Sequence, residues 1–499
     1  MKTLTCLLAL LLGCLASAGP IPLAGSAFDL SSLPTFPVPW KVTSGKILDA
    51  ENKEVRVVFA NLTGYACLPD TDAKAERWAA SLKREGYGGA RLHHIDWILR
   101  ADRSKKADLD RFRIKLLKYG LVYTLEGYSE YGDREEQKRG LLLGPLVPDP
   151  FAAARNAVIR AEWADYVTWL LTSRGPSITN SRPMAQDKNL VMICPVNEDV
   201  LPGITEGQYK SAFTWEKSVI QSTGYAGIVF GANSGIPDGW NLDQVVNPHH
   251  EYWDHPFLPG MKATSGLFNR TIYWPERSGQ ARICTEYGSL WPNWFRAETE
   301  AQFAGWARDN GVQVVAPFAR STNWAQWEED GLALDSFFYG NDPVRVSTAR
   351  LMALCMANPA ASSVEWDKAT GRYVRHGAIY IEIQGGWRWS DVGQWNRNLF
   401  VIAPAPNGSH LIFTGEDAQM SGFTGTGSNE YDFTITDRGV LPITEFAQDR
   451  RIDWWRSRPK EVWALDTFTG KRLQRIPFMW MGDHARFWTK GFWIEVVPT

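Results

Sequence analysis

The feature that most constrains the fold is a regular alternation of short apolar strands with helical stretches. Eight such strands can be counted, from "VRVVFANL" at Val55 to "VQVVAPFARSTNW" ending at Trp324, with helices or long loops between them. Strands that alternate with helices are typical of a parallel sheet, and eight repeats favour a closed (β/α)8 TIM barrel. The alternative is a doubly wound open sheet, but no glycine-rich nucleotide-binding turn of the usual spacing follows an early strand. We therefore predict an α/β fold with the barrel over residues 45–365.

After about Arg372 the pattern changes. Segments such as "GAIYIEIQGG", "NLFVIAPA" and "GFWIEVV" are short and alternating, and Gly, Asn and Asp turns separate them. This pattern is typical of antiparallel strands. We predict a C-terminal β-sandwich domain over residues 366–499, and an N-terminal lead segment over residues 19–44.

The first eighteen residues are expected to be a targeting signal. Lys2 precedes an apolar stretch from Leu4 to Leu15, and Ala16-Ser17-Ala18 forms a small-residue cleavage site. The apolar stretch is too short to span a bilayer. The sequence thus predicts a signal peptide at residues 1–18 and a secreted or periplasmic protein; acylation at Cys14, which would anchor a lipoprotein, is the alternative.

Composition excludes some classes of partner. A net charge of −2 argues against binding of nucleic acid or of an anionic membrane surface. The cysteines beyond the signal show no CxxC spacing, so no structural zinc is indicated, and Cys194 and Cys284 are expected to be buried in strands. No cofactor is expected. The 24 Trp are abundant enough to supply both core packing and flat platforms for sugar rings.

Polar residues gather where the predicted strands end, which in a barrel is where the functional site lies. They are Arg91, His93, His94 and Asp96 after the second strand, Glu126 and Tyr128 after the third, Asn197 and Glu198 after the fourth, His249, His250 and Tyr252 near the sixth, Glu286 and Tyr287 after the seventh, and Asn323 and Trp324 after the eighth. Five of the eight histidines lie in or beside two of these groups: His93, His94, His249, His250 and His255. Adjacent histidines on a strand point to opposite faces, however, so we predict no metal site.

The stretch "VMICPVNEDV" raises a physical question, because an apolar strand runs directly into Asn197 and Glu198. Burying an unpaired carboxylate costs roughly several kcal/mol, so a carboxylate at the end of a buried strand indicates a functional role. Glu286 ends the seventh strand, across the mouth of a barrel from Glu198. Two carboxyl groups about 5 Å apart, one protonated and one ionised, are what retaining glycoside hydrolysis needs.

The motifs "PVNED" and "ICTEYG" resemble the acid/base and nucleophile motifs of clan A retaining glycoside hydrolases, most closely those of family 5, the cellulases and mannanases. The resemblance runs from about Gly45 to the "NDPVRVSTAR" helix. It implies that Glu198 is the acid/base, Glu286 the nucleophile and Asn197 the partner of the sugar 2-hydroxyl. It further implies that Arg91 holds the nucleophile ionised, that His250 and Tyr252 form the family's His-x-Tyr, and that Trp324 is a sugar platform.

The chain departs from the family at the third strand, which ends in Glu126-Gly127-Tyr128 where the family usually has a histidine. This leaves the subsite chemistry, and hence the substrate, open. His94 is a further candidate for substrate binding, and Glu126, Asp96 and Glu251 are other acids that could reach the cleft.

We expect a secreted retaining glycoside hydrolase that cleaves β-linked glycans of an oligo- or polysaccharide. Two alternatives remain: a non-catalytic carbohydrate-binding protein on a barrel scaffold, and an exo-acting β-galactosidase-like enzyme. Sugar, linkage and oligomeric state are not indicated by the sequence.

Overall fold

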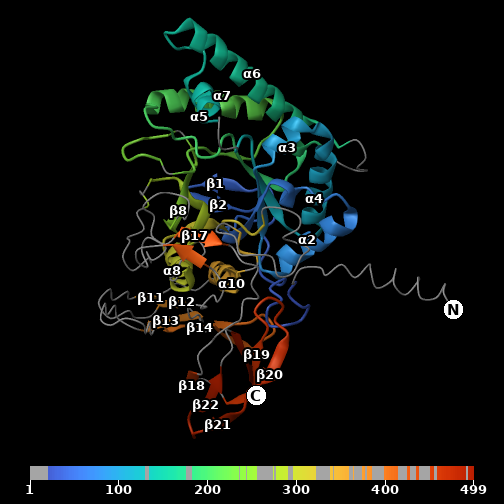
Figure 1. Ribbon diagram of the computed structural model, residues 1–499, viewed down its shortest axis with the longest axis vertical. Helices are drawn as coiled ribbons and strands as arrows, with labels where there is room; N and C mark the ends of the chain where they lie inside the picture. The colour runs from blue at the N-terminus through green and yellow to red at the C-terminus, as the bar shows by residue number, and fades with distance from the viewer. Residues whose placement is uncertain are drawn as a thin grey trace, which may run out of the picture.

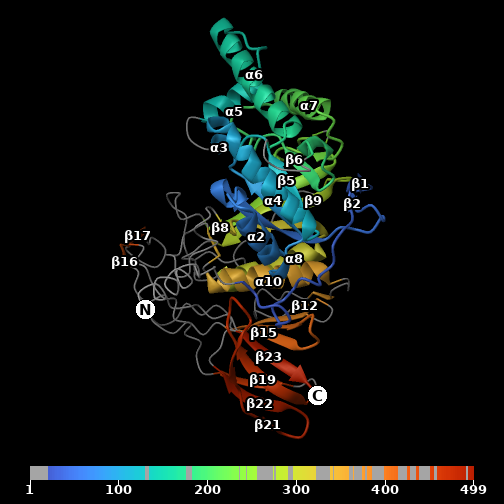
Figure 2. The ribbon, with the colours of Figure 1, turned by 90° about the vertical axis from the view of Figure 1, so that its right-hand side faces the viewer.

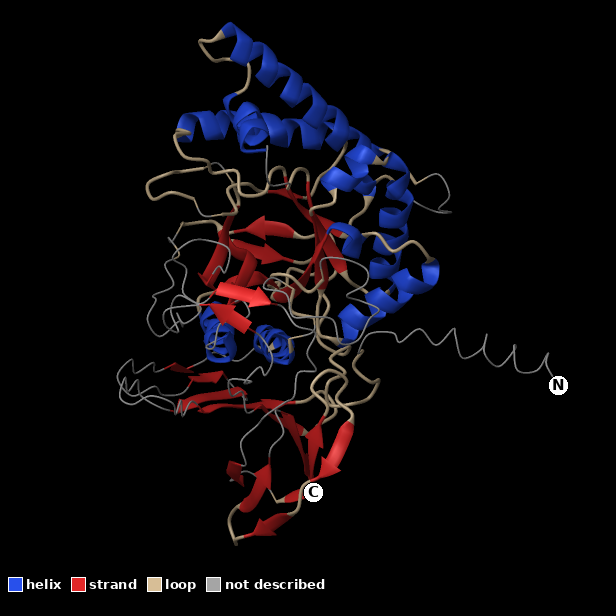
Figure 3. Ribbon diagram, in the orientation of Figure 1, coloured by secondary structure: helices blue, strands red, loops and turns tan. Residues whose placement is uncertain are grey.

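The computed structural model describes residues 21–129, 134–175, 182–234, 236–242, 244–254, 274, 277–289, 296–321, 338–340, 342–358, 363–364, 374–376, 379–384, 398–413, 424–426, 434–437, 450–454, 458–489 and 493–499. Strands occupy the centre of the molecule, helices surround them, and further strands lie at one end (Figures 1 and 3). The predicted signal peptide at residues 1–18 lies outside the described residues.

Eight parallel strands form the central sheet, in the order β7-β6-β5-β4-β3-β10-β9-β8. They are β3 Val57–Thr63, β4 Gly89–His93, β5 Val122–Glu126, β6 Leu190–Cys194, β7 Ile228–Val229, β8 Val246–Asp254, β9 Ala281–Ser289 and β10 Val312–Pro317. The first strand, β3, pairs with the last, β10, as the first and last strands of a (β/α)8 barrel do. All eight predicted strands are thus confirmed, in the strand order of a (β/α)8 barrel.

The curled sheet is less regular between β7 and β8. Among the described residues no backbone ladder joins these two strands, and the backbone N–H of Gly231 instead donates to the Gln244 side chain at 3.0 Å. β7 contributes only two residues to the ladder with β6. The barrel is therefore confirmed as a curled eight-stranded sheet, with side-chain bonding at this junction.

Helices cover the outside of the sheet, with α2, α3 and α4 running beside the strands and α5, α6 and α7 grouped at one end (Figure 2). The helices are α2 Asp72–Arg84, α3 Asp96–Ala101, α4 Lys106–Lys118, α5 Arg134–Leu143, α6 Pro150–Thr172, α7 Glu206–Ser222, α8 Arg296–Asp309 and α10 Pro343–Ala357; short 3-10 turns are η1 Gly64–Cys67, η2 Arg103–Lys105 and η3 Met184–Gln186. Their starts follow local capping chemistry. Thr205 and Gln208 form a capping box at α7, and Asp342 caps α10 just before Pro343. No helix among the described residues is long and apolar enough to cross a membrane.

The interior of the curled sheet is apolar toward the start of the strands and polar toward their ends. The apolar part is one buried cluster with members such as Phe59, Met192 and Ile283. Trp40 and Ile47 join it from the hairpin of β1 Lys41–Thr43 and β2 Lys46–Leu48, so the hairpin closes that end of the barrel. The buried polar side chains lie at the opposite end of the barrel, where the strands end.

The C-terminal part contains the predicted antiparallel strands. One sheet has the order β11-β12-β13-β14-β15-β23-β19-β20, a second the order β18-β22-β21, and β16 pairs with β17. The bounds are β11 Ser363–Val364, β12 Val374–His376, β13 Ile379–Gln384, β14 Asn398–Pro404, β15 His410–Phe413, β16 Thr424–Thr426, β17 Thr434–Asp437, β18 Arg450–Trp454, β19 Pro459–Leu465, β20 Arg472–Arg475, β21 Phe478–Trp480, β22 Ala485–Thr489 and β23 Trp493–Pro498. One buried cluster contains residues of both larger sheets. An antiparallel sheet is therefore confirmed, whereas a complete sandwich stays a prediction.

The C-terminal sheet packs directly on α10. The indole of Trp493 in β23 donates to the Ser347 hydroxyl at 2.7 Å, and the Arg350 guanidinium lies over the rings of Phe28 and Trp493. Phe28 belongs to the predicted lead segment and is fully buried. The lead segment, the barrel and the C-terminal sheet therefore share one packed junction.

Candidate active site

Charged and amide side chains line the barrel where the strands end. Asn61 of β3, Arg91 of β4, Glu126 of β5, Asn197 after β6 and Glu286 of β9 are each at most 2% exposed. Buried groups of this kind are tolerated only when they are paired. Arg91 is the common partner of all the others: its guanidinium bonds each of these four side chains.

Glu286 is aimed into the mouth by an irregularity in β9. The pairing of β8 with β9 goes from His249 opposite Cys284 to His250 opposite Glu286, so β9 has one extra residue, Thr285, at this point. An extra residue reverses the alternation of side chains beyond it. Ile283 accordingly lies in the inner cluster, Cys284 in the outer one, and Glu286 again faces inward.

The carboxylate of Glu286 is held at both oxygens. Its Oε1 accepts from Nη1 of Arg91 at 2.7 Å, and its Oε2 accepts from the Tyr252 hydroxyl at 2.6 Å. The side chain is 3% exposed. Arg91 and Tyr252 thus fix the position of this carboxylate in the mouth of the barrel.

Glu198 sits on a strained backbone, with a φ of +50°. Its N–H donates to Oδ1 of Asn233 at 2.7 Å, and the preceding Asn197 is tied by its own N–H to the carbonyl of Tyr128 at 2.8 Å. A left-handed non-glycine residue persists only when neighbours fix it. The Glu198 side chain is 27% exposed, in contrast to Glu286.

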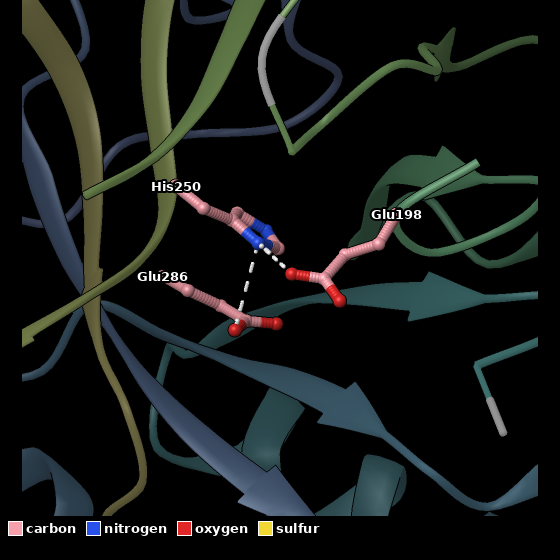
Figure 4. A group of neighbouring side chains, drawn as sticks. All are labelled: Glu198, His250 and Glu286. Carbon is pink, nitrogen blue, oxygen red and sulfur yellow. Dashed lines mark hydrogen bonds and ion pairs between the residues drawn. The ribbon is translucent and has the colours of Figure 1, made fainter. Parts of the chain in front are cut away.

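The two glutamates face each other with His250 between them (Figure 4). Nδ1 of His250 lies 2.9 Å from Oε1 of Glu198 and 3.6 Å from Oε2 of Glu286, and its Nε2 lies 3.0 Å from the Thr285 hydroxyl. One oxygen of each glutamate and one nitrogen of His250 all lie within 4.8 Å of one another. The structure therefore brings Glu198, Glu286, His250, Tyr252, Arg91 and Asn197 together.

Asn197 presents a free donor in the same place. Its Oδ1 accepts from Arg91 at 2.9 Å and from Asn233 at 2.8 Å. Its Nδ2 is buried and has no hydrogen-bond partner within the described part of the chain. A buried N–H₂ in this position is suited to a ligand hydroxyl.

Glu126 is one of the three acids that the sequence left unassigned, and it lies at the centre of the site. Its Oε1 accepts from both Nε and Nη2 of Arg91, and its Oε2 is paired with Nδ1 of His93. Burial and the neighbouring Arg91 keep the pKa of His93 well below its usual value, so the ring is neutral.

The other candidate residues lie around this centre. Contrary to the expectation of opposite faces, the His93 and His94 rings lie 3.7 Å apart, because His94 leaves the strand with a φ of +52°. Asp96 accepts from Ser129, and Glu251 pairs with His249. Trp324 lies outside the described residues, and so does His255.

Glu198, His250 and Glu286 also satisfy the spacing of a three-ligand metal site. The chemistry of their partners disfavours a cation, however. The Arg91 guanidinium already lies 2.7 Å from Glu286, and Tyr252 occupies the other oxygen. The absence of a metal at this site therefore stays a prediction.

Four residues of the site were not identified in the sequence: Asn61, Asn233, Thr285 and Lys138. Lys138 on α5 is buried and donates to the carbonyl of Asn197 at 2.6 Å, and burial lowers its pKa. Asn61 and Thr285 follow strand alternation and could have been found as polar residues in apolar strands. Asn233 and Lys138 lie in loop and helix, where no local pattern marks them.

No model of a known protein family matches the chain, and a search of curated proteins found no match. Solved structures with a similar course of the chain include an endo-β-1,4-mannanase from Thermotoga petrophila, with 12% identity, a TM-score of 0.47, and coverage of 74% of this chain and 97% of that one. An endo-1,4-β-mannanase from Rhizomucor miehei has 11% identity, a TM-score of 0.44, and coverage of 64% and 99%. A glycoside hydrolase family 5 mannosidase from Rhizomucor miehei has 12% identity, a TM-score of 0.45, and coverage of 66% and 99%. Each of these three structures is similar to this chain over nearly all of its own length.

Proposed function

We propose that this protein is a retaining glycoside hydrolase that cleaves β-linked glycans by double displacement, with Glu198 as acid/base and Glu286 as nucleophile. The observation that carries the proposal is the approach of the two carboxyl groups, with oxygens within 4.8 Å. Retaining enzymes hold their carboxyl groups about 5–5.5 Å apart, whereas inverting enzymes leave about 6.5–9.5 Å for a water molecule. The short separation supports direct attack by one carboxylate.

The environments of the two glutamates support different roles. Glu286 is buried and bonded by Arg91 and Tyr252, an arrangement that keeps a nucleophile ionised and aligned. Glu198 is partly exposed and bonded to His250, so it can exchange a proton with a leaving group and later with water.

The reaction then follows in two steps. Glu198 protonates the glycosidic oxygen while Glu286 attacks the anomeric carbon, which forms a glycosyl-enzyme and releases the first product. Glu198 then removes a proton from water, and the resulting attack frees Glu286 and the sugar. Asn197 donates its amide N–H, which has no partner among the described residues, to the sugar. We place Trp324 among the substrate contacts by resemblance, and His94 by its position after the second strand of the barrel.

The site of action belongs to the proposal as well. The charged start, apolar stretch and small-residue cleavage motif of residues 1–18 support export, to the outside of the cell or the periplasm. The four remaining cysteines, Cys67, Cys194, Cys284 and Cys355, are buried and unpaired, so the fold does not depend on an oxidising compartment.

The proposal is tested by a screen of the purified protein against β-linked polysaccharides and aryl β-glycosides, with products separated by chromatography. Glu286→Ala should lower turnover by roughly a thousandfold or more while melting like the wild type, since the lost group acts only in the reaction. The exposed Glu136→Gln on α5 is the matched control and should turn over normally. Full turnover by Glu286→Ala would contradict the assignment, and binding of glycan without any cleavage would favour the carbohydrate-binding alternative.

A further inference from the structure

The site holds three carboxyl groups, Glu126, Glu198 and Glu286, one more than the reaction needs, and two of them share one guanidinium. Arg91 donates through Nε and Nη2 to Oε1 of Glu126, and through Nη1 to Oε1 of Glu286. The side chains of Glu126 and Glu286 are each at most 3% exposed. The nucleophile therefore shares its only guanidinium partner among the described residues with a second buried carboxylate.

His93 joins the same two acids. Its Nδ1 is paired with Oε2 of Glu126, and its Nε2 lies 3.7 Å from Oε1 of Glu286 without a hydrogen-bond partner in the described residues. A neutral imidazole carries one proton, and the carboxylate of Glu126 requires that proton on Nδ1. Nε2 therefore presents a lone pair, not a proton, toward the nucleophile.

We propose that Glu126 is a positioning residue that keeps the nucleophile reactive, by sharing Arg91 with Glu286 and by holding His93 with its lone pair toward Glu286. The inference rests on the proposed function and names a determinant of its first step. Both actions reduce the positive potential at Glu286.

The charge of Glu126 also suits the course of the reaction. With Arg91 positive and His93 neutral, Glu126 and Glu286 leave the buried group one negative charge in excess. Attack by Glu286 turns its carboxylate into an uncharged ester, through a transition state with positive charge on the sugar ring, while the proton of Glu198 goes to the leaving oxygen. A fixed negative charge nearby favours the loss of the Glu286 charge and the positive charge on the ring, and it acts strongly because the site is shielded from water.

The isosteric variant Glu126→Gln removes the negative charge and reverses the tautomer of His93. Both changes make the surroundings of Glu286 more positive. Its carbonyl oxygen can still accept from Arg91, so its N–H₂ faces Nδ1 of His93 and donates to it. Nδ1 must then be the acceptor, and the imidazole proton moves to Nε2, where it points at Glu286. The Glu286 carboxylate gains a donor and loses a negative neighbour, and becomes a weaker nucleophile.

The test is the pH profile of kcat/KM for an aryl β-glycoside that the wild type cleaves. The acid limb of that profile reports ionisation of the nucleophile in the free enzyme. Glu198, His250, Tyr252, Arg91, His93 and Lys138 also face this space and are unchanged in the variant. We expect Glu126→Gln to move the acid limb to lower pH by about one unit and to lower kcat/KM about 10- to 100-fold at the optimum.

The direction of the shift separates this role from a structural one. If Glu126 only held Arg91 in place, the variant would loosen Arg91, Glu286 would be protonated more readily, and the acid limb would move to higher pH. That result, or no shift, would overturn the proposal. Glu300→Gln removes the charge from another buried glutamate that is bonded to an arginine, Arg345, outside the mouth, and should leave the profile unchanged.

Glu126→Asp provides a second variant in case the glutamine variant unfolds. It keeps the charge and shortens the side chain, so we expect the acid limb to stay within about 0.3 unit of the wild type. A shift to higher pH would show that geometry alone matters and would overturn the proposal. Absence of cleavage by the wild type would overturn the proposed function as well, whereas normal cleavage with an unshifted Glu126→Gln limb would overturn this inference alone.

Discussion

At the scale of single residues, the most unusual group outside the mouth is Glu216 on α7. It is fully buried, and its two carboxyl oxygens have no hydrogen-bond partner in the part of the chain that the structure describes. Burial raises its pKa to about 8, and the nearby Asp199 contributes while Arg160 opposes. Asp199 itself, which follows the proposed acid/base, has a pKa raised by burial to about 6. Glu216 therefore carries a proton at neutral pH.

We predict that Glu216 makes the fold less stable as pH rises. Its pKa in the folded state lies above the ordinary value of 4.5, so between about pH 5 and 8 the folded state binds the proton more tightly than the unfolded state. The free energy of unfolding should fall through this range by at most about 1.4 kcal/mol per pH unit from this group. Urea unfolding at several pH values measures the slope. Glu216→Gln, which is uncharged and of equal size, should flatten it; an unchanged slope would contradict the assigned ionisation.

At the scale of secondary-structure elements, the end of β6 is the part that the surroundings hold most closely. Asn197 is fixed by the Tyr128 carbonyl, by Arg91 and by Lys138, and Glu198 is fixed through its N–H by Asn233. These partners come from β4, β5, α5 and the loop after β7. The strained φ of Glu198 is therefore maintained by several neighbouring elements together.

We predict that Asn233→Ala lowers kcat about 10- to 100-fold with little change in KM, because it releases the Glu198 backbone and misplaces the proton donor without touching the substrate. Steady-state kinetics would measure the two parameters separately. Asn310→Ala, at the end of α8, removes an asparagine that also bonds backbone and serves as the control. A variant of Asn233 with normal kcat would show that Glu198 needs no such support.

Element patterns in the sequence were sufficient for the eight strands, because apolar runs are a local property. They were not sufficient for three features of the site. The extra residue in β9, the left-handed His94 and the left-handed Glu198 all depend on neighbouring elements. Strict alternation therefore placed His93 and His94 on opposite faces, whereas their ring centroids lie 3.7 Å apart.

At the scale of the whole molecule, the barrel depends on both of its flanking parts. The β1–β2 hairpin closes the apolar end of the barrel. The side-chain amide of Gln313 in β10 accepts from the Ile47 N–H of that hairpin at 2.8 Å and donates to the Ile47 carbonyl at 3.0 Å. At the other junction, the Arg350 guanidinium of α10 lies over the rings of Phe28 and Trp493. This packing supports a bracing role for the C-terminal sheet.

The pairing of residues across the barrel is also a property of the whole molecule, and it explains the limit of the sequence prediction. Glu198 and Glu286 could be paired because both end predicted strands that lie across a barrel mouth from each other, and the family resemblance then supplied their roles. Glu126 had no such guide: its bonds to Arg91 and His93 follow from how β4 and β5 are staggered, which no single strand encodes.

The measurement that tests the central claim most directly is the location of the covalent intermediate. The wild type would be incubated with an activated 2-deoxy-2-fluoro glycoside of the sugar that the screen identifies, and the protein and its peptides weighed by mass spectrometry. We expect the mass of the protein to increase by one fluorosugar, and the labelled peptide to carry it on Glu286. A label on Glu198 or Glu126, or no label on an enzyme that turns over the parent glycoside, would contradict it.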